Sequence, residues 1–179
     1  MGDEDRGPTQ NPLALFYPDQ LNIVPCGLRQ IKQLRFLLCT VFPELVGTKP
    51  SQWLVICATS RVALYDGIVL GVICIRLEAD ERTMSINDQK LEQPVLYRCY
   101  VAHLACLAPY RRLGIGTQLL RNAIDSCTQR GDVAAIYLHT QVSNEAAVQL
   151  YAKSGFTIVA THKNYYPYED AYLMVKHLM

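Results

Sequence analysis

The segment of this chain that most limits what it can fold into is residues 106–120, CLAPYRRLGIGTQLL. An apolar stretch runs into a proline and two arginines, and Gly114 and Gly116 then open a segment whose apolar residues have helical spacing. This order predicts a strand, a tight loop and a helix, with backbone N–H groups pointing outward at the start of the helix. Together with Arg111 and Arg112, these groups predict a site for a phosphate-like anion, because glycine leaves room for a close approach.

The glycine spacing also limits which anion-binding motif this loop can be. A dinucleotide-binding fingerprint has a third glycine at the position that Leu119 occupies here, and a nucleoside-triphosphate loop has Lys and then Ser or Thr after its last glycine. Nicotinamide and nucleoside-triphosphate chemistries are therefore disfavoured. From the residues alone, a tight turn that binds no ligand remains an alternative.

Apolar periodicity along the rest of the chain predicts alternating strands and helices in one domain, 20–179, after a flexible or docking tail, 1–19. Residues 80–94 are too polar to pack and are expected to form a solvated loop. The order of elements predicts a mixed α/β sheet with helices on both faces. Strands are expected at 21–26, 61–65, 68–79, 95–107, 133–142 (central, buried on both faces), 155–166 and 169–178, and helices at 28–42, 50–60, 115–127 and 144–153.

The overall composition disfavours several classes of function. The 179 residues carry 17 basic and 16 acidic side chains, a formal net charge of +1, so non-specific binding to nucleic acid is not expected. No apolar run reaches the ~18 residues that a membrane span requires, and the acidic start MGDEDRG resembles no targeting peptide, so we expect a soluble protein. Seven scattered cysteines without a CxxC pair indicate reduced thiols in the cytosol and no metal site.

Three strings in the second half of the chain carry a resemblance to a known family: CLAPYRRLGIGT, IYLHTQVSNEAAVQLYAKSGF and KNYY. The Arg-x-x-Gly-x-Gly loop is similar to the acetyl-CoA loop of the GNAT acetyltransferase superfamily. The three strings together resemble its N-terminal acetyltransferases of the NatE type, roughly over residues 22–175. The resemblance implies a single-domain α/β GNAT fold, with a mixed, mostly antiparallel seven-stranded sheet flanked by about four helices. It also implies transfer of acetyl from acetyl-CoA to the α-amine of protein N-termini, without a metal.

The resemblance assigns a series of positions to acetyl-CoA. The glycine loop would hold the pyrophosphate of acetyl-CoA. The pantetheine arm would be held by the backbone amides of Leu104 and Cys106 and by the side chain of Asn144. Tyr151, two turns beyond Asn144 on one helix face, would protonate the leaving thiolate, although packing between helix and sheet remains an alternative for it. The full set is Leu104, Ala105, Cys106, Leu107, Arg111, Arg112, Leu113, Gly114, Ile115, Gly116, Thr117, Asn144 and Tyr151.

Acetyl transfer to an α-amine requires a base, and two residues match the family's catalytic positions. The resemblance implies that Tyr100 and His139 order a water that takes the proton from the amine. It also implies that a backbone N–H within residues 104–107 stabilises the tetrahedral oxyanion. A strong base is not required, because the pKa of an α-amine is ~8 and part of the amine is already neutral at pH 7. From residue type alone, a half-buried strand tyrosine and a core histidine remain alternatives.

Two loops are implied to bind the peptide N-terminus: VFPELV and NYYPYED. The first loop would form an apolar pocket for the side chain of the first residue of the peptide. NatE-type enzymes prefer N-termini in which Met is followed by a hydrophobic residue. The second would grip the peptide backbone and exclude internal lysines. The family's Phe-Pro-Val-x-Tyr reads Phe-Pro-Glu-Leu-Val here, so Glu44 is a departure from the pattern. The implied substrate contacts are Phe42, Pro43, Val46, Ala102, Tyr165 and Tyr166.

Two other functions are left open by the sequence. One is a weak or inactive structural subunit of a ribosome-associated NatA-type complex, but the intact glycine loop with Tyr100 and His139 favours an active enzyme. The other is an acetyltransferase for lysines or small amines, which would have an open site without a tyrosine-rich gate. The expected setting is cytoplasmic, with a NatA-type complex and, through it, the ribosome as partners.

Overall fold

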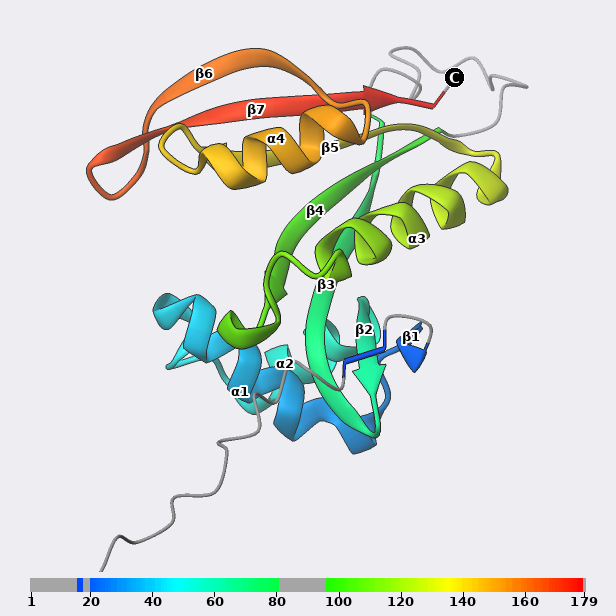
Figure 1. Cartoon of the computed structure of the whole chain (residues 1–179). Coiled ribbons are helices and arrows are strands. Elements are labelled where there is room, and N and C mark those ends of the chain that lie inside the picture. Colours follow the sequence, from blue (N-terminus) through cyan, green and yellow to red (C-terminus); the bar gives the residue numbers. More distant parts are fainter. Residues whose placement is uncertain (1–15, 18–19, 81–95, 179) are drawn as a thin grey trace, which may run out of the picture.

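Seven strands form one sheet in the order β1-β2-β3-β4-β5-β7-β6 in the computed structural model (Figure 1). The structure describes residues 16–17, 20–80 and 96–178. The strands are β1 (Asn22–Pro25), β2 (Ser60–Tyr65), β3 (Ile68–Ala79), β4 (Tyr97–Cys106), β5 (Val133–Gln141), β6 (Thr157–Tyr166) and β7 (Glu169–His177). The helices are α1 (Ile31–Val41), α2 (Pro50–Ala58), α3 (Ile115–Arg130) and α4 (Glu145–Lys153), with 3-10 turns η3 (Leu28–Gln30), η4 (Pro43–Leu45) and η6 (Ala108–Tyr110).

The predicted α/β fold is confirmed, including the order of its strands and helices. The solvated loop expected at 80–94 lies outside the described residues except for Asp80. That residue is buried, and its N–H donates to the Leu96 carbonyl at 2.8 Å, so the expectation was wrong at this position. At the N-terminus, the ring of Phe16 packs 5.0 Å from that of Tyr65, and the Tyr17 N–H donates to the Tyr65 hydroxyl.

The sheet is mixed and mostly antiparallel, as expected, because among the described strands only β4 and β5 run parallel. Their pairing is short: it begins at Tyr97 beside Val133 and ends at Tyr100 beside Tyr137. Beyond that point the two strands diverge, and each continues for several residues without the other (Figure 1). The divergence divides the sheet into a β1–β4 half and a β5–β7 half.

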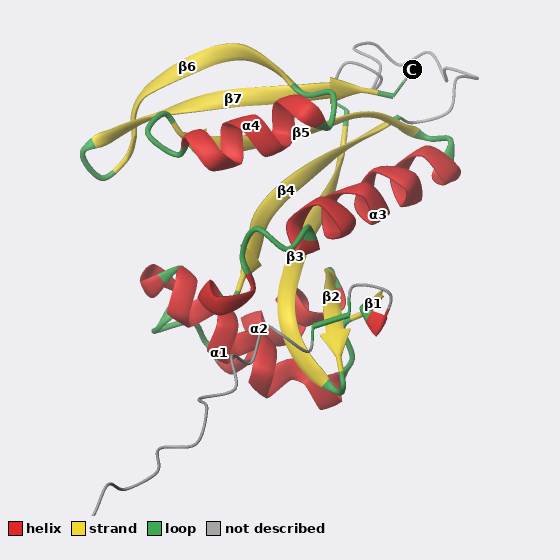
Figure 2. Ribbon diagram, viewed as in Figure 1, coloured by secondary structure: helices red, strands yellow, loops and turns green. Residues whose placement is uncertain are grey.

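Helices cover both faces of the sheet, as predicted, but not evenly. Alternate residues of β3 belong to two separate apolar cores, Ile73 to the one under α3 and α4 and Val72 to the one under α1 and α2. Figure 2 shows α1 and α2 gathered at the β1–β4 end of the sheet. The second face of β5 is therefore only half-buried at Tyr137 and His139, and the expectation of burial on both faces was wrong.

The remaining composition-based expectations concern thiols and membrane spans. All seven cysteines are free thiols, and most are buried, where they behave as small apolar side chains. Within the part of the chain that the structure describes, no helix is both long and apolar enough to cross a membrane.

Candidate active site

The glycine loop has the geometry that the sequence predicts for an anion site. Gly114 adopts a left-handed conformation with a φ of 82° and is the N-cap of α3. The first main-chain bond within the helix runs from the Gln118 N–H to the Gly114 carbonyl. The three intervening amides, Ile115, Gly116 and Thr117, therefore have no acceptor in the helix and are directed out of its N-terminus.

Packing within the protein does not explain why both loop positions are glycine. A Cβ on Gly114 would have no heavy atom within 4 Å among the described residues, and one on Gly116 would make only an ordinary contact of 3.6 Å with Leu150. Gly114 is required by its positive φ, whereas Gly116 has no such requirement. The space beside these amides is therefore left free for a ligand.

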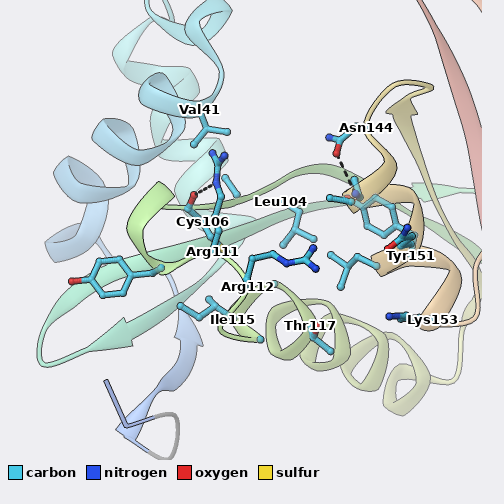
Figure 3. A pocket seen from close by; sticks show the side chains of 18 of the residues that line it. Val41, Leu104, Cys106, Arg111, Arg112, Ile115, Thr117, Asn144, Tyr151 and Lys153 are labelled. Carbon is cyan, nitrogen blue, oxygen red and sulfur yellow. Dashed lines mark hydrogen bonds between the residues drawn. The ribbon is translucent and has the colours of Figure 1, made fainter. Parts of the chain in front are cut away.

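A cavity of about 520 Å³ opens directly at this loop, between α3, α4 and the end of β4 (Figure 3). Arg111 and Arg112 flank it: the Arg111 Nε donates to the Cys106 carbonyl at 3.3 Å, and Arg112 extends along the cavity toward α4. The lining residues that were predicted for the cofactor are Leu104, Ala105, Cys106, Arg111, Arg112, Gly114, Ile115, Gly116, Thr117, Asn144 and Tyr151. The others are Val41, Phe42, Tyr110, Ala146, Ala147, Gln149, Leu150 and Lys153.

Two of the predicted cofactor residues, Leu107 and Leu113, do not line the cavity. The Leu107 N–H donates to the Leu70 carbonyl at 2.9 Å and is therefore not free to hold a ligand or an oxyanion. Hydrogen-bonded and non-bonded positions alternate along an antiparallel pair, so the amide of Ala105 also faces β3, whereas those of Leu104 and Cys106 face away. These two amides point into the gap where β4 and β5 have parted.

The two predicted α4 residues reach the cavity from the other side. The Asn144 side chain caps α4 by accepting a hydrogen bond from the Ala147 N–H at 3.1 Å, which leaves its amide nitrogen for another partner (Figure 3). Tyr151 is buried in the core under α3 and α4 and also lines the cavity, so packing between helix and sheet does not exclude a contact with a ligand. Burial, and secondarily the neighbouring Tyr166, raises the pKa of Tyr151 and keeps its hydroxyl protonated.

Tyr100 and His139 converge where β4 and β5 diverge, on the sheet face opposite α3. Their ring centroids lie 6.0 Å apart in an edge-on arrangement. Burial, followed by the interaction with the Tyr165 hydroxyl, raises the pKa of Tyr100, so this tyrosine is neutral at physiological pH. The Arg76 guanidinium lies over the Tyr100 ring, 5.2 Å from its centroid, in a cation–π contact.

His139 is held by contacts from β6 that the sequence did not predict. Its ring stacks on Tyr165 at 4.2 Å with an interplanar angle of 10°, and its Nε2 lies 3.2 Å from Nδ1 of His162. Its Nδ1 is buried and has no hydrogen-bond partner among the described residues. Burial, and secondarily the charge of His162, lowers the pKa of His139 and favours the neutral imidazole that a base must present.

The predicted substrate residues lie around this pair. The Tyr166 hydroxyl donates to the His139 carbonyl at 3.3 Å, and the Tyr165 and Tyr166 rings meet edge to face at 5.1 Å. Ala102 is the extra residue of a bulge in β4, between the partners of Ile75 and Cys74.

The first loop lies against the same strand. Pro43 opens the turn η4, and the Phe42 ring packs 5.0 Å from His103, which follows the bulge. Val46, at the end of the turn, is 62% exposed. Burial lowers the pKa of His103, while the nearby Glu44 carboxylate opposes that shift.

Comparison with known proteins agrees with this geometry. The acetyltransferase (GNAT) family matches residues 34–156, which include the glycine loop, Tyr100 and His139. The chain belongs to the GNAT acetyltransferase family. The sequence resemblance and the single-domain GNAT fold are thereby confirmed.

This GNAT chain has several relatives named N-alpha-acetyltransferase. It is 38% identical over 152 residues to N-alpha-acetyltransferase 50 of Danio rerio, which covers 83% of each chain. It is 36% identical over 137 residues to the probable N-acetyltransferase san of Drosophila melanogaster, covering 76% of this chain and 67% of that protein. The structure of Arabidopsis thaliana Naa50 in complex with the bisubstrate analogue CoA-Ac-MVNAL matches with a TM-score of 0.71 at 31% identity, over 88% of this chain and 98% of that one. The chain is an enzyme of the N-alpha-acetyltransferase class.

Sequence reasoning missed two kinds of residue at this GNAT site. Ala147 and Leu150 lie on the face of α4 that Asn144 and Tyr151 share, so helical spacing alone would have found them. His162 has no such signal, because it reaches His139 only through the pairing of β5, β7 and β6.

Proposed function

We propose that this enzyme transfers acetyl from acetyl-CoA to the α-amine of protein N-termini, with Tyr100 and His139 ordering the water that removes the amine's proton. The observation that carries the proposal is the meeting of this pair at the point where β4 and β5 part, on the strand that further along presents the outward-facing amides of Leu104 and Cys106. At this opening between the strands, a substrate amine on one face of the sheet can contact a thioester that enters from the other face.

The residues of the cavity fit acetyl-CoA. The amides at the start of α3, with Arg112 beside them, suit a diphosphate, and the amides of Leu104 and Cys106 suit the peptide-like pantetheine arm. Acetyl-CoA would supply the thioester carbonyl that the amine attacks. The same strand-end amides are the donors available for the oxyanion, while the Leu107 amide, committed to β3, is not.

Proton transfer follows from the state of the three ionisable side chains. His139, with its lowered pKa, is neutral near pH 7 and accepts the amine's proton through water. Tyr100, with its raised pKa, stays protonated and orders that water as a hydrogen-bond partner. Tyr151, likewise protonated and next to the cavity, donates a proton to the departing thiolate.

We further propose a preference for N-termini that begin with Met and a hydrophobic residue. Support comes from the apolar side chain of Phe42 beside the cavity and from the MVNAL peptide in the analogue bound by the Arabidopsis thaliana relative. Tyr165 and Tyr166, which both contact His139 and meet each other edge to face, would narrow the access to the amine site and so disfavour an internal lysine side chain. Glu44, near His103 and Tyr166, adds a negative charge that can attract the incoming ammonium group.

Catalysis is tested with Tyr100→Phe and His139→Ala. Each should lower turnover by about 10²-fold or more while the affinity for acetyl-CoA stays within a few-fold, because neither residue lines the cavity. The matched controls are Tyr17→Phe and His177→Ala, which change exposed residues of the same types outside the two substrate loops and should retain full activity. Near-native turnover in both active-site variants would remove the pair as catalysts.

Substrate class is tested by mass-spectrometric mapping of products on peptides with varied first and second residues. Acetylation should occur at the α-amine and be fastest for Met followed by a hydrophobic residue. Equal or faster modification of lysine in peptides with blocked N-termini would contradict the proposal.

Association with a NatA-type complex, and through it the ribosome, in the cytoplasm is the remaining part of the proposal. Phe36 on α1 and Leu54 and Val55 on α2 are exposed apolar side chains, at 67%, 52% and 64%, and offer a surface suited to a protein partner. Phe36→Glu with Val55→Glu should abolish co-purification with such a complex and leave peptide acetylation unchanged. Unchanged co-purification would contradict this assignment of the surface.

A further inference from the structure

His162 lies beside the active-site histidine without belonging to the strand pair that forms the site. It is on β6, whereas His139 is on β5, and β7 runs between them. In register, His139 is opposite Leu173 of β7 and His162 is opposite Ala171, two residues away on the same face. The small, fully buried Ala171 leaves room above β7 for the two rings to approach. Their centroids are 5.1 Å apart, with Nδ1 of His162 at 3.2 Å from Nε2 of His139.

This contact divides the two nitrogens of His139 between two roles. Nε2 is engaged by His162, and Nδ1 is the buried nitrogen that has no partner within the described ranges. Stacking on Tyr165 and the edge contact with Tyr100 fix the plane of the ring. With Nδ1 unpartnered, no described group occupies a lone pair on that nitrogen. A neutral imidazole carries one N–H, so when Nδ1 has the lone pair Nε2 is the N–H donor.

We propose that His162 is a positioning residue that accepts a hydrogen bond from Nε2–H of His139 and so keeps Nδ1 of His139 free as the base. This inference rests on the proposed role of His139. In the proton transfer, the lone pair of Nδ1 takes a proton from the ordered water, which takes one from the substrate amine. The resulting imidazolium keeps its Nε2–H bonded to the neutral His162, which stabilises the charge. The proton later returns from Nδ1 to the ordered water, and the tautomer is restored.

Among the groups packed against His139, His162 is the one whose protonation acts on the pKa of His139. Tyr100 comes from β4, Tyr165 and Tyr166 from β6, and β7 presents Leu173 and Ala171. Lys163, next to His162, is paired with Asp170 at 2.6 Å, and Glu44 and Glu169 lie nearer to Tyr166. When His162 binds a proton on Nδ1, it loses the lone pair that accepts the bond and also repels a proton on His139.

The tautomer is tested first, without any assay of activity, by NMR of the full chain with ¹⁵N-labelled histidine. Above the titration range, His139 should carry its hydrogen on Nε2, and His162→Ala should give a mixture of the two tautomers. Hydrogen on Nδ1 of His139 in the unchanged protein overturns the inference. Because this measurement is independent of turnover, it remains decisive even if peptide acetylation is not observed.

Turnover supplies the second test. His162→Ala should lower kcat about tenfold, with KM for peptide and for acetyl-CoA within twofold, because the acceptor is lost but no ligand contact is. His162→Asn, whose side-chain oxygen can reach the position of Nδ1, should restore most of that loss. Thr161→Ala, a change at the exposed neighbour on β6, is the control and should be neutral. Equal losses in the Ala and Asn variants would indicate a merely structural role and contradict the inference.

The pH profile separates charge from hydrogen bonding. Below the pKa of the substrate amine, log(kcat/KM) should fall with a slope of about one, and a second unit of slope should appear where His139 is protonated. The charge of His162 lowers the pKa of His139, whereas the hydrogen bond to His162 stabilises the imidazolium and raises that pKa. His162→Asn removes the charge and keeps the acceptor, so it should move the second break to higher pH, and further than His162→Ala, which loses both. An unmoved break in His162→Asn would show that the charge of His162 does not act on His139.

Discussion

At Gly114, the backbone conformation of one residue determines the direction of the N–H groups that are available to a ligand. The φ of 82° at Gly114 turns the chain so that the next three backbone N–H groups point out of the helix N-terminus toward the cavity. Arg112, two residues earlier, also has a positive φ, of 66°. A side chain at Gly114 would have no clash with the described residues, so any cost arises from the backbone itself. The position can therefore be tested by comparison with a second left-handed glycine elsewhere.

Gly114→Ala and Gly131→Ala provide that comparison. Gly131 ends α3 with a φ of 72° and, like Gly114, has open space around its Cβ position. Both variants should lose about 1–2 kcal/mol of unfolding free energy, because the left-handed region disfavours a Cβ. Only Gly114→Ala should also weaken acetyl-CoA binding, by tenfold or more in calorimetric titration, because the amides move. Equal affinities in the two variants would remove the loop as the diphosphate site.

The active-site residues differ in how far the sequence could predict them. Tyr100 and His139 were predicted because each matches a catalytic position of the family, and the structure brings their rings together. His162 was not, because an exposed histidine on an edge strand has no distinguishing neighbours in sequence. The unsuitability of the Leu107 amide was equally hidden, since it depends on which positions of β4 are bonded to β3.

Among the elements, α3 is placed by a glycine on the strand beneath it. A Cβ on Gly71 of β3 would lie 2.9 Å from Ile115, 3.0 Å from Leu119 and 3.1 Å from the Ala105 carbonyl. The absence of a side chain there lets the first turns of α3 sit directly on the sheet. Because those turns carry the outward-facing amides, the packing of one strand residue determines where the anion site lies.

Gly71→Ala should therefore affect both stability and binding. Forcing a methyl group between packed side chains and a backbone oxygen should lower the free energy of unfolding by about 1–3 kcal/mol. It should also weaken acetyl-CoA binding, since α3 must shift. Urea unfolding and calorimetric titration measure the two effects, with Gly47→Ala, whose Cβ position is open, as the control. An unchanged urea midpoint would show that the helix has space to accommodate the methyl group.

Element positions were predictable because each element has its own local signal. Asn144 before α4 and Gly155 after it, for example, mark a helix with a cap at each end, and the structure confirms both. The two-sided burial expected for β5 was wrong, because an apolar run shows that a strand is central but not how far helices extend over it. The role of Gly71 was not predictable, since its contacts lie on an element far along the chain.

At the scale of the whole molecule, the short parallel pairing of β4 with β5 divides the sheet into two halves. The two halves of the sheet share a continuous core under α3 and α4, but their strands are joined only from Tyr97 to Tyr100. The cavity spans this division: the glycine loop and the β4 amides come from the first side, and Asn144, Tyr151 and Lys153 from the second. A ligand that fills it therefore contacts both halves at once.

Acetyl-CoA should accordingly stabilise the molecule across the division rather than at one loop. At a hundredfold excess over Kd, selective binding to the folded state contributes about 2.7 kcal/mol, which should raise Tm by several degrees. Hydrogen exchange should slow at the start of α3, at Leu104 and Cys106, and in the first turns of α4 together. S-acetylpantetheine, which lacks the diphosphate, is the matched control and should protect the β4 amides while leaving α3 unprotected. Protection confined to α3 with the complete ligand would show that the two halves are not coupled through the site.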